Sequence, residues 1–586
     1  MGKRKPVITR SLRSVGLATG SLWTVAGVLL VSGCTAAHYR RSADKEVYGI
    51  VKQYEAKIFG LTNSTFTIDT PYSGRKPETI PPAELIEDRL QTGRRTLTIA
   101  QSLDLAVSRS RRYQTAKETL YLTALSLTGS RYAFSPQFFA NSTATYTRDT
   151  DHEQFGSVNS QVGVSQLLKT GGQLSGSLAN DILRYYTGDP RRSLVSILSV
   201  NLTQPLLRGF GRNNPAVENL TQAERNVVYA VRSFSFFQDQ FALEILIDHF
   251  NLLAQKDIMR NRYTNYLGRV QSTQRLEARA ADRERLADVD QARQAELTAK
   301  DNYVNAVASY RNSLDQFKIK LGLPLGEKLT LDDGELDEME KNGLVPAPLD
   351  PVAAYRVATQ KQLLILNAID TFEDTKRKIR VAANQLQADL KIIADADLSS
   401  TPPTDYSHFD PDKVRADVGL QLNLPIDRLP ERNLYRSSLV AFEAGLRSFT
   451  LALDALKESI DQGLRTLDQS RQNYEIQKNA LDLANRRVES TTLLLEAGRA
   501  EVRDLVDAQD AQIAAQNAVT AALVGYQQTR LQLMLDIGAL DTEVPKFWLK
   551  DHLAAFLPGR APASGTASPS ESKEEAVLPP DQYFSE

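Results

Sequence analysis

The residues best suited to attract cations are six carboxylates that follow two short breaks in long helical patterns. They are Glu284, Asp288, Asp290, Asp504, Asp507 and Asp510. Three of them, Asp504, Asp507 and Asp510, recur every three residues, so they lie near one face of a helix. In a symmetric oligomer such carboxylates would form acidic rings, which select cations and gate pores. The alternative is an ordinary solvated helix face. We interpret Asp288, Asp290, Asp504 and Asp507 as candidates for a pore constriction.

Arginine side chains lie close to these carboxylates in the sequence. Arg283 and Arg285 belong to the first group, and Arg499 and Arg503 border the second. They could pair with the carboxylates across a narrow tube and hold it shut. They could equally form ordinary ion pairs on a helix surface, which contribute little to stability. The sequence leaves both interpretations open.

The chain lacks the patterns that enzyme sites require. Its five histidines are scattered, without the HExxH spacing of a zinc site, so we predict no metal and no cofactor. It contains no glycine-rich phosphate loop and no GxSxG sequence. A formal net charge of −1 gives no excess of lysine and arginine to neutralise phosphates. We therefore predict that the protein is not an enzyme and has no nucleic-acid partner.

The first residues have the pattern of a bacterial export signal. A basic segment (residues 3–13) precedes an apolar stretch (residues 15–30), and the sequence VSGC follows, ending in Cys34, the only cysteine. This sequence resembles the lipobox of bacterial lipoproteins, in which the cysteine thiol receives diacylglycerol before cleavage. We predict a lipoprotein signal peptide over residues 1–33 and a lipid on Cys34, with Thr35 favouring the outer membrane. The alternative is an ordinary signal peptide with an incidental cysteine.

The same order of elements occurs twice along the chain. A segment ending in LTQPLL (residues 202–207) precedes one long helical pattern, and LNLPI (residues 422–426) precedes another. Each helical pattern is interrupted once, and a short break between antiparallel helices marks the tip of a hairpin. We predict long coiled-coil hairpins over residues 214–322 and 433–540. Their tips are predicted at Arg279, Ala280, Ala281, Asp282, Gly498, Arg499, Ala500 and Glu501.

Amphipathic strands precede both hairpins. Residues 137–206 and 386–425 contain segments with one apolar face and one face of Ser, Thr, Gln, Asn and Gly. In a soluble sandwich the apolar face would be core, whereas in a transmembrane barrel it meets lipid and the polar face lines water. One chain has too few strands to close a barrel, and open edges cannot lie in lipid. A membrane sheet would therefore require oligomerisation.

The remaining segments connect or flank these elements. We expect residues 34–95 to be a lipid-anchored tether, residues 331–349 an acidic linker and residues 542–586 a largely disordered tail. Two repeats, each opening with a helix, then span residues 96–330 and 350–541. The predicted fold class is α+β, mainly α, with an internal twofold repeat.

Between about Thr96 and Leu540 the chain resembles the TolC-like outer-membrane factors of efflux pumps and type I secretion systems. The best-matching segments are VNLTQPLL (residues 200–207) and LEAGRAEV (residues 495–502), the latter followed by Asp507-Ala508-Gln509. The resemblance implies a homotrimer in which each protomer gives four strands to one twelve-stranded barrel, while the helices form a periplasmic tunnel. It also implies that the tips bind a periplasmic adaptor, which connects the channel to an inner-membrane transporter.

Two features depart from the pattern of this family. Asp427-Arg428-Leu429-Pro430 stands where the second half would carry a glycine-rich turn after its strand. The first half contains more strand than two membrane crossings require. We interpret the hairpin around Thr170-Gly171-Gly172 as an insertion or an extracellular extension.

We predict a lipid-anchored channel of the outer membrane, with a large periplasmic part, that exports small molecules or proteins passively. The main alternative is a non-conducting coiled-coil lipoprotein that acts as a strut between the outer membrane and periplasmic partners. A periplasmic adaptor fits less well, because an adaptor needs one hairpin flanked by small β-domains and this chain contains two. In such an architecture the partner pump mostly selects the cargo.

Overall fold

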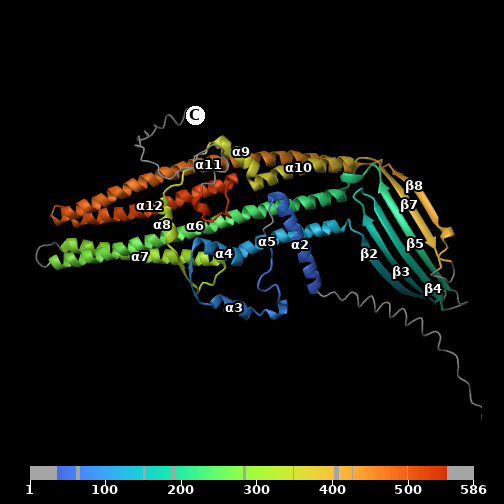
Figure 1. Ribbon diagram of the computed structural model, residues 1–586, viewed down its shortest axis with the longest axis horizontal. Helices are drawn as coiled ribbons and strands as arrows, with labels where there is room; N and C mark the ends of the chain where they lie inside the picture. Colours follow the sequence, from blue (N-terminus) through green and yellow to red (C-terminus); the bar gives the residue numbers. More distant parts are fainter. Residues whose placement is uncertain are drawn as a thin grey trace, which may run out of the picture.

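The computed structural model describes residues 36–60, 66–148, 154–186, 192–280, 286–347, 349–401, 408–424, 426–497 and 499–550. The protein is elongated, with a β-sheet at one end and helices that extend from it to the other end (Figure 1). Within these ranges, no helix combines the length and the apolar character that a membrane crossing requires. The chain is mostly helical with a sheet, as predicted from the sequence.

The main sheet contains six antiparallel strands in the order β2-β3-β4-β5-β7-β8. These strands are β2 (Gln137–Arg148), β3 (Gln154–Leu167), β4 (Gln173–Tyr185), β5 (Arg192–Pro205), β7 (Asp389–Ser399) and β8 (Arg415–Asn423). The first half gives four strands and the second half two, so the expectation of four strands per chain is wrong. Pairing of β5 with β7 joins the two halves in one sheet.

The turn between β3 and β4 lies at the helical end of the sheet. The backbone N–H of Gly211, just before the long helix that follows, donates to the carbonyl of Thr170 at 2.8 Å. Gly171 has a φ of +87°, and a Cβ there would lie 2.3 Å from the carbonyl oxygen of Gly209, so only glycine fits. The expectation of an extracellular extension at this turn is therefore wrong, because the turn packs beside the helices.

Two helical hairpins extend from the sheet. They consist of α6 (Pro215–Ala280) with α7 (Leu286–Leu321) and of α11 (Leu429–Glu496) with α12 (Val502–Ile537). At 1.5 Å per residue, the 66 residues of α6 span about 100 Å. Because α7 and α12 are shorter, the rest of α6 and α11 packs against α5 (Arg111–Tyr132) and α10 (Leu363–Asn384), the helices that precede the strands.

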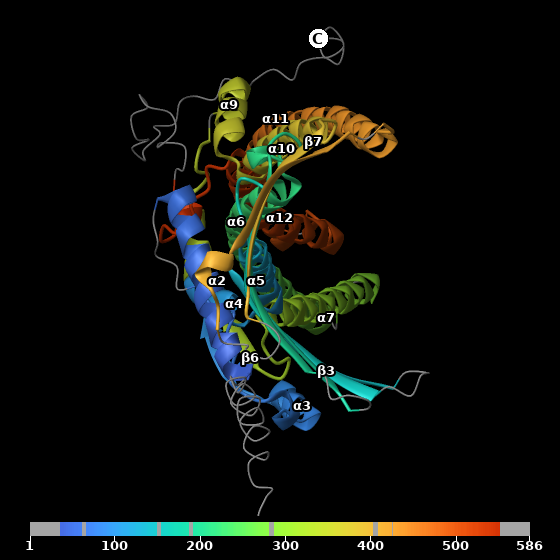
Figure 2. The same cartoon turned by 90° about the vertical axis from the view of Figure 1, so that its right-hand side faces the viewer.

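Part of the segment expected to be a tether is attached to the helical body. Helix α2 (Ala36–Phe59) packs on α5 and α6, and Figure 2 shows it beside α5. Val47 and Val51 are fully buried, and the hydroxyl of Tyr121 in α5 donates to Asp44 at 2.8 Å. The apolar spacing of this segment therefore serves packing within the chain.

The connection between the halves is ordered around a second, small sheet. Strand β1 (Arg94–Leu97) pairs in parallel with β6 (Lys328–Leu331), and α8 (Gly334–Asn342) forms within the expected acidic linker. Lys256 and Arg260 of α6 both pair with Asp333 beside α8. The other short elements are α3 (Pro82–Leu90), α4 (Ile99–Arg109), α9 (Pro351–Lys361) and the 3-10 turns η1 (Pro77–Thr79), η2 (Gly211–Asn213), η3 (Pro411–Lys413) and η4 (Phe547–Leu549).

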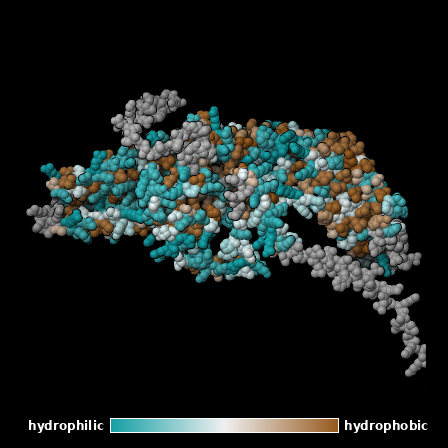
Figure 3. Space-filling view, in the orientation of Figure 1, coloured by the Kyte–Doolittle hydropathy of each residue, from teal (hydrophilic) through white to brown (hydrophobic). Residues whose placement is uncertain are grey.

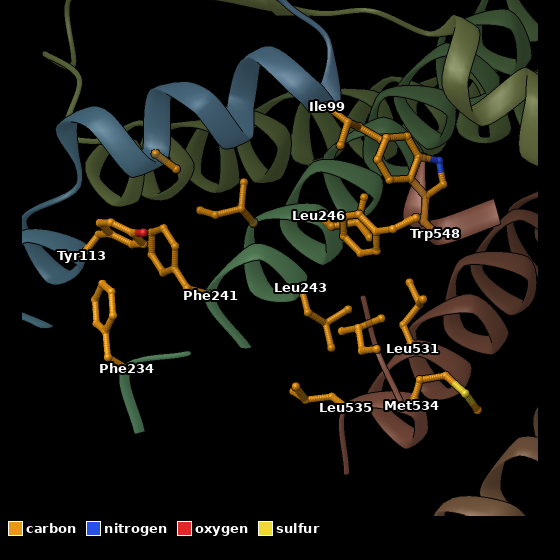
Figure 4. Close-up of a cluster of buried hydrophobic side chains, with 14 of the residues drawn as sticks. Ile99, Tyr113, Phe234, Phe241, Leu243, Leu246, Leu531, Met534, Leu535 and Trp548 are labelled. Atoms are coloured by element: carbon orange, nitrogen blue, oxygen red, sulfur yellow. The ribbon is translucent and has the colours of Figure 1, made fainter. Parts of the chain in front are cut away.

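Part of the largest apolar core lies where α4, α5, α6 and α12 meet the residues that follow α12 (Figure 4). Leu243 of α6 and Leu535 of α12 are almost completely buried in it. Trp548 is 4 % exposed, and its carbonyl accepts hydrogen bonds from Gln527 and Arg530 of α12. Residues 542–550 thus pack on the helical body, although the sequence placed them in a disordered tail.

A buried network of charged side chains joins α6 to α10. Asp374 of α10 is 2 % exposed and accepts hydrogen bonds from the hydroxyl of Tyr229 at 2.6 Å and from Arg377 at 2.8 Å. Arg225 pairs with the same carboxylate. Burial alone would raise the pKa of Asp374, but the hydrogen bonds from Tyr229 and Arg377 bring it below its ordinary value. The halves are therefore held together by paired charges as well as by the sheet.

We expect Asp374→Ala to lower the free energy of unfolding by about 3 kcal/mol, because it removes the buried carboxylate that Arg225 and Arg377 share. Asp370→Ala is the matched control. Asp370 also pairs with Arg225, but its side chain is 30 % exposed, so the expected loss is below about 1 kcal/mol. Chemical denaturation of the detergent-solubilised variants measures both changes, and equal losses would contradict the importance of Asp374.

A second prediction concerns pH. Asp239 of α6 accepts a hydrogen bond from the Thr542 hydroxyl at 2.7 Å, and burial, reinforced by Asp541 and Glu543, raises its pKa from 3.8 to about 6. The folded state therefore binds the proton more tightly, and the free energy of unfolding falls as pH rises from about 4 to about 6. Asp239→Asn should add on the order of 2 kcal/mol at pH 7 and change little at pH 4. Thermal unfolding at both pH values measures this difference, and the same gain at both would contradict the raised pKa.

Candidate functional site

The curved sheet has one apolar face, which is convex. Residues paired across antiparallel strands point to the same side, so the strand register defines the face. Val162 of β3, Leu178 of β4 and Leu198 of β5 are register partners, and all three are exposed. Other exposed apolar residues of this face are Phe138, Ile182, Val200, Val418, Leu420 and Leu422. Figure 2 shows the curvature, and Figure 3 shows apolar side chains gathered over the sheet.

The concave face of the sheet is mainly polar, although Phe139 and Ile197 also lie on it, and its charge is mainly negative. Asn141 of β2 and Gln161 of β3 are register partners on it, as are Asn201, Asp395 and Asp417 on β5, β7 and β8. Its charged residues in the described strands are Asp181, Asp389, Lys391, Asp395, Asp397, Arg415 and Asp417. Because carboxylates outnumber basic groups there, the potential of this face favours cations in the adjacent water.

A row of small polar side chains crosses the apolar face. Ser142, Ser160, Asn180 and Ser196 are successive register partners on β2 to β5. The hydroxyls of Ser142 and Ser160 lie 2.7 Å apart, and the hydroxyl of Ser196 donates to the side-chain oxygen of Asn180. The backbone N–H of Ser196 donates to Ser400 at 2.9 Å. Since these groups bind one another, they can lie on an apolar surface without water as a partner.

The hairpin tips lie at the end of the molecule farthest from the sheet (Figure 1). Of the residues predicted for the first tip, Arg279 and Ala280 are the last two of α6. The residues of this region that lie outside the described part are Ala281, Asp282, Arg283, Glu284 and Arg285. The predicted pairing of Arg283 and Arg285 with the carboxylates therefore stays a prediction.

In the second tip, Arg499 and Ala500 connect α11 to α12, and Gly498 lies outside the described residues. Glu501 is the N-cap of α12, and its side chain accepts a hydrogen bond from the backbone of Asp504. In return, the backbone N–H of Glu501 donates to the carboxylate of Asp504 at 3.0 Å. This reciprocal cap satisfies two N–H groups that the helix would leave free.

The predicted constriction residues lie in the first two turns of α7 and α12. Asp290, Asp504 and Asp507 are exposed, and Asp288 is half-buried. Arg503 lies 4.0 Å from Asp507 in the same helix, an exposed contact. A single copy thus presents these carboxylates to solvent without bringing the two groups into one site.

An ion pair between the two hairpins lies close to the tips. Arg269 of α6 is 4 % exposed, and its Nη2 donates to the carbonyl of Val506 at 2.9 Å and to Asp510 at 2.8 Å, both in α12. Leu276 and Val502 belong to a small buried cluster beside it. Sequence reasoning missed Arg269, because an arginine within a long polar helix is usually solvated. The only signal in the sequence was Asp510, which belongs to the series of aspartates that recurs every three residues.

The described residues contain no group of three or more side chains that could hold a metal ion. His249 of α6 is completely buried, with Nδ1 3.2 Å from the hydroxyl of Ser102. Burial lowers the pKa of His249 to about 4. At neutral pH this imidazole is uncharged and forms part of the core.

Comparisons with known proteins bear on the fold. No family model matches this sequence, and no curated protein matches it. Similar solved structures include the outer-membrane channel MtrE of Neisseria gonorrhoeae, with a TM-score of 0.56 and 14% identity over 75% of this chain and 88% of that chain. The outer-membrane channel CmeC of Campylobacter jejuni has a TM-score of 0.55 and 12% identity over 75% and 85%. The outer membrane protein VceC of Vibrio cholerae has a TM-score of 0.55 and 13% identity over 75% and 96%.

The similarity extends over most of each compared structure. At least 85% of the length of MtrE, CmeC and VceC has a counterpart in this chain. Three quarters of this chain take part in each superposition. The chain has the fold of the TolC-like outer-membrane factors, as its resemblance to them predicts.

Proposed function

We propose that this protein is the outer-membrane channel of a tripartite efflux pump or a type I secretion system, and that it works as a homotrimer. The observation that carries this proposal is a curved sheet with an exposed apolar convex face, joined directly to two long helical hairpins. The convex face meets lipid, and the concave face lines water. Transport is passive diffusion through the resulting tube, and no residue performs a reaction.

The lengths of the elements suit this role. Strands β3 and β5 contain 14 residues each, and at about 3.3 Å per residue and a tilt near 45° such a strand rises about 33 Å. This matches the hydrocarbon core of a bilayer, which is about 30 Å thick. The helices then extend into the periplasm, and the lipid on Cys34 anchors the mature chain to the inner surface of the outer membrane.

The helical tips are the proposed contact with partners. A periplasmic adaptor that leads to an inner-membrane transporter would bind the two tips, residues 279–282 and 498–501. In a trimer, the carboxylates of Asp288, Asp290, Asp504 and Asp507 each occur three times around one axis. Rings of this kind would form a constriction that favours cations.

The apolar surface also argues against the non-conducting strut. A strut would hold its sheet in water, where large contiguous apolar patches are uncommon on soluble proteins. Here exposed apolar residues occur on β2, β3, β4, β5 and β8, and Val418 on β8 is 80 % exposed. Lipid is the solvent that such a surface fits.

In planar lipid bilayers we expect the purified protein to form pores, and Asp510→Ala to increase their conductance. Asp510 accepts a hydrogen bond from the buried Arg269 of the other hairpin. Such charged hydrogen bonds contribute about 1.5–3 kcal/mol, so its loss should raise the open-to-closed ratio about tenfold or more.

Asp468→Ala is the matched control, because Asp468 pairs with Arg471 at 2.9 Å within one exposed helix, away from the tips. Its conductance should equal that of the parent protein. If Asp510→Ala and Asp468→Ala behave alike, the ion pair between the hairpins does not hold the tube closed. If neither the parent nor Asp510→Ala conducts, the protein is not a channel.

Removal of the lipid separates the channel from the strut. We expect the Cys34→Ser protein to stay in the membrane pellet after carbonate or urea extraction, because the apolar face of the sheet remains in lipid without the anchor. Fractionation followed by immunoblotting, beside the parent protein, measures this. Release of Cys34→Ser protein into the supernatant would favour the strut and contradict the channel.

A further inference from the structure

The sheet has two open edges. β2 and β8 are its outermost strands, and among the described residues each pairs along one side only. All 9 residues of β8 are exposed, as are 11 of the 12 residues of β2. The free backbone N–H and C=O groups along such edges attract another strand, and in lipid they cannot stay unpaired.

The directions of the edge strands allow the two edges to pair with each other in neighbouring copies. β2 follows α5 and starts at the helical end of the sheet, whereas β8 leads into α11 and ends there. β8 of one copy and β2 of the next would therefore run antiparallel. Because each copy contributes an even number of strands, six, the alternation of direction continues across every such junction.

Both faces also continue across this junction. On the convex side, β2 presents Phe138 and Tyr146, and β8 presents Val418 and Leu420, all at least 64 % exposed. On the concave side, β2 presents polar residues, including Thr143, with Phe139 as the one apolar residue, and β8 presents polar residues and a glycine. A second copy of this chain thus fits the edge in hydrogen bonding, in direction and in polarity.

The six strands belong to one wall. β3 and β4 pair along their whole length, from Phe155 with Tyr185 to Leu167 with Gln173. β3 pairs also with β2, and β4 with β5, so neither strand can leave the sheet without breaking a long ladder of hydrogen bonds. On the convex face they present Val162, Leu178 and Ile182, which are exposed like the apolar residues of the neighbouring strands, beside the polar row that includes Ser160 and Asn180.

We propose that three copies, with six strands each, close a single barrel of eighteen strands, in which β8 of each copy pairs with β2 of the next. This inference rests on the trimeric channel proposed above and deepens it. It replaces the twelve-stranded barrel that the family resemblance implies. Compared with four strands per copy, each copy then contributes one additional β-hairpin, such as β3–β4, and the three additional hairpins increase the diameter of the barrel.

Barrel diameter grows roughly in proportion to the number of strands, so eighteen strands give a barrel about one and a half times as wide as twelve. With strands about 4.8 Å apart and tilted by about 40°, the diameter of the backbone is roughly 36 Å. Barrels of 16–18 strands leave an aqueous channel inside. The membrane end of this tube would therefore pass bulky or polymeric cargo, and the carboxylates of the concave face would line it.

Disulfide cross-linking tests the junction between copies. Every variant carries Cys34→Ser, which removes the only cysteine. Thr143→Cys on β2 is combined with Asp417→Cys, Gly419→Cys or Gln421→Cys on β8, which share the concave face and sample the possible registers. Within one copy these positions lie on opposite edges of the sheet, beyond the 7 Å or so between Cα atoms that a disulfide spans. Any disulfide must therefore join two copies.

After oxidation in membranes, we expect covalent dimers and trimers on a denaturing gel, with no larger species. Thr143→Cys combined with Asn159→Cys is the control, because these register partners lie within one copy and should give no ladder. A ladder that ends at two copies would mean twelve strands and would overturn the proposal. A ladder beyond three copies would overturn it as well.

Conductance of the same variants separates this proposal from the proposed function. If the protein conducts but no pair between β2 and β8 forms a disulfide, the eighteen-stranded barrel is wrong and the channel stands. If the cross-links stop at trimers and the protein conducts, both stand. If neither the parent protein nor any variant conducts or cross-links, both fall.

Discussion

The backbone hydrogen bonds of the sheet are the constraint on which the rest of this structure depends. Each internal strand pairs on both sides, and the ladder runs without interruption from β2 through β5 to β7 and β8. The two outer strands leave polar groups that water can satisfy and lipid cannot. A sheet with an apolar convex face and open edges would therefore be incomplete in a membrane as a single copy, and this incompleteness is the basis of the proposed oligomer.

The same ladder joins the two halves of the chain. Pairing of β5 with β7 sets their relative position at one end, and the network around Asp374 holds α6 against α10 behind the sheet. Further along, Arg269 connects α6 to Asp510 of α12. These contacts are polar, and the burial of Asp374 and Arg269 makes each of them costly to break. The hairpins are thus positioned by specific charge pairs, whereas the core around Leu243 and Leu535 contributes apolar contact that is less directional.

Much of the candidate site could be predicted because its signals are local. The alternation in residues 137–206 indicates strands, and breaks in the helical patterns near Ala280 and Gly498 indicate tips, since both depend on spacing within a few residues. The roles of individual side chains were harder to predict. Asp504, predicted for a constriction, also completes the cap of α12, and the carboxylate that contacts the other hairpin is Asp510. Aspartates that recur every three positions are equivalent in the sequence pattern. Only the groups that each one contacts in the folded structure distinguish their roles.

The sequence by itself determined the kind of protein this is: long helices in pairs, amphipathic strands before each pair, and no pattern suited to catalysis. Periodicity carries that information, because the geometry of a helix or a strand repeats over a few residues. Only the tertiary structure decided that six strands share one sheet, that residues 542–550 pack on the core, and that Arg269 binds Asp510. Each of these depends on contact between segments far apart in the chain, and such contacts leave no local pattern from which to predict them.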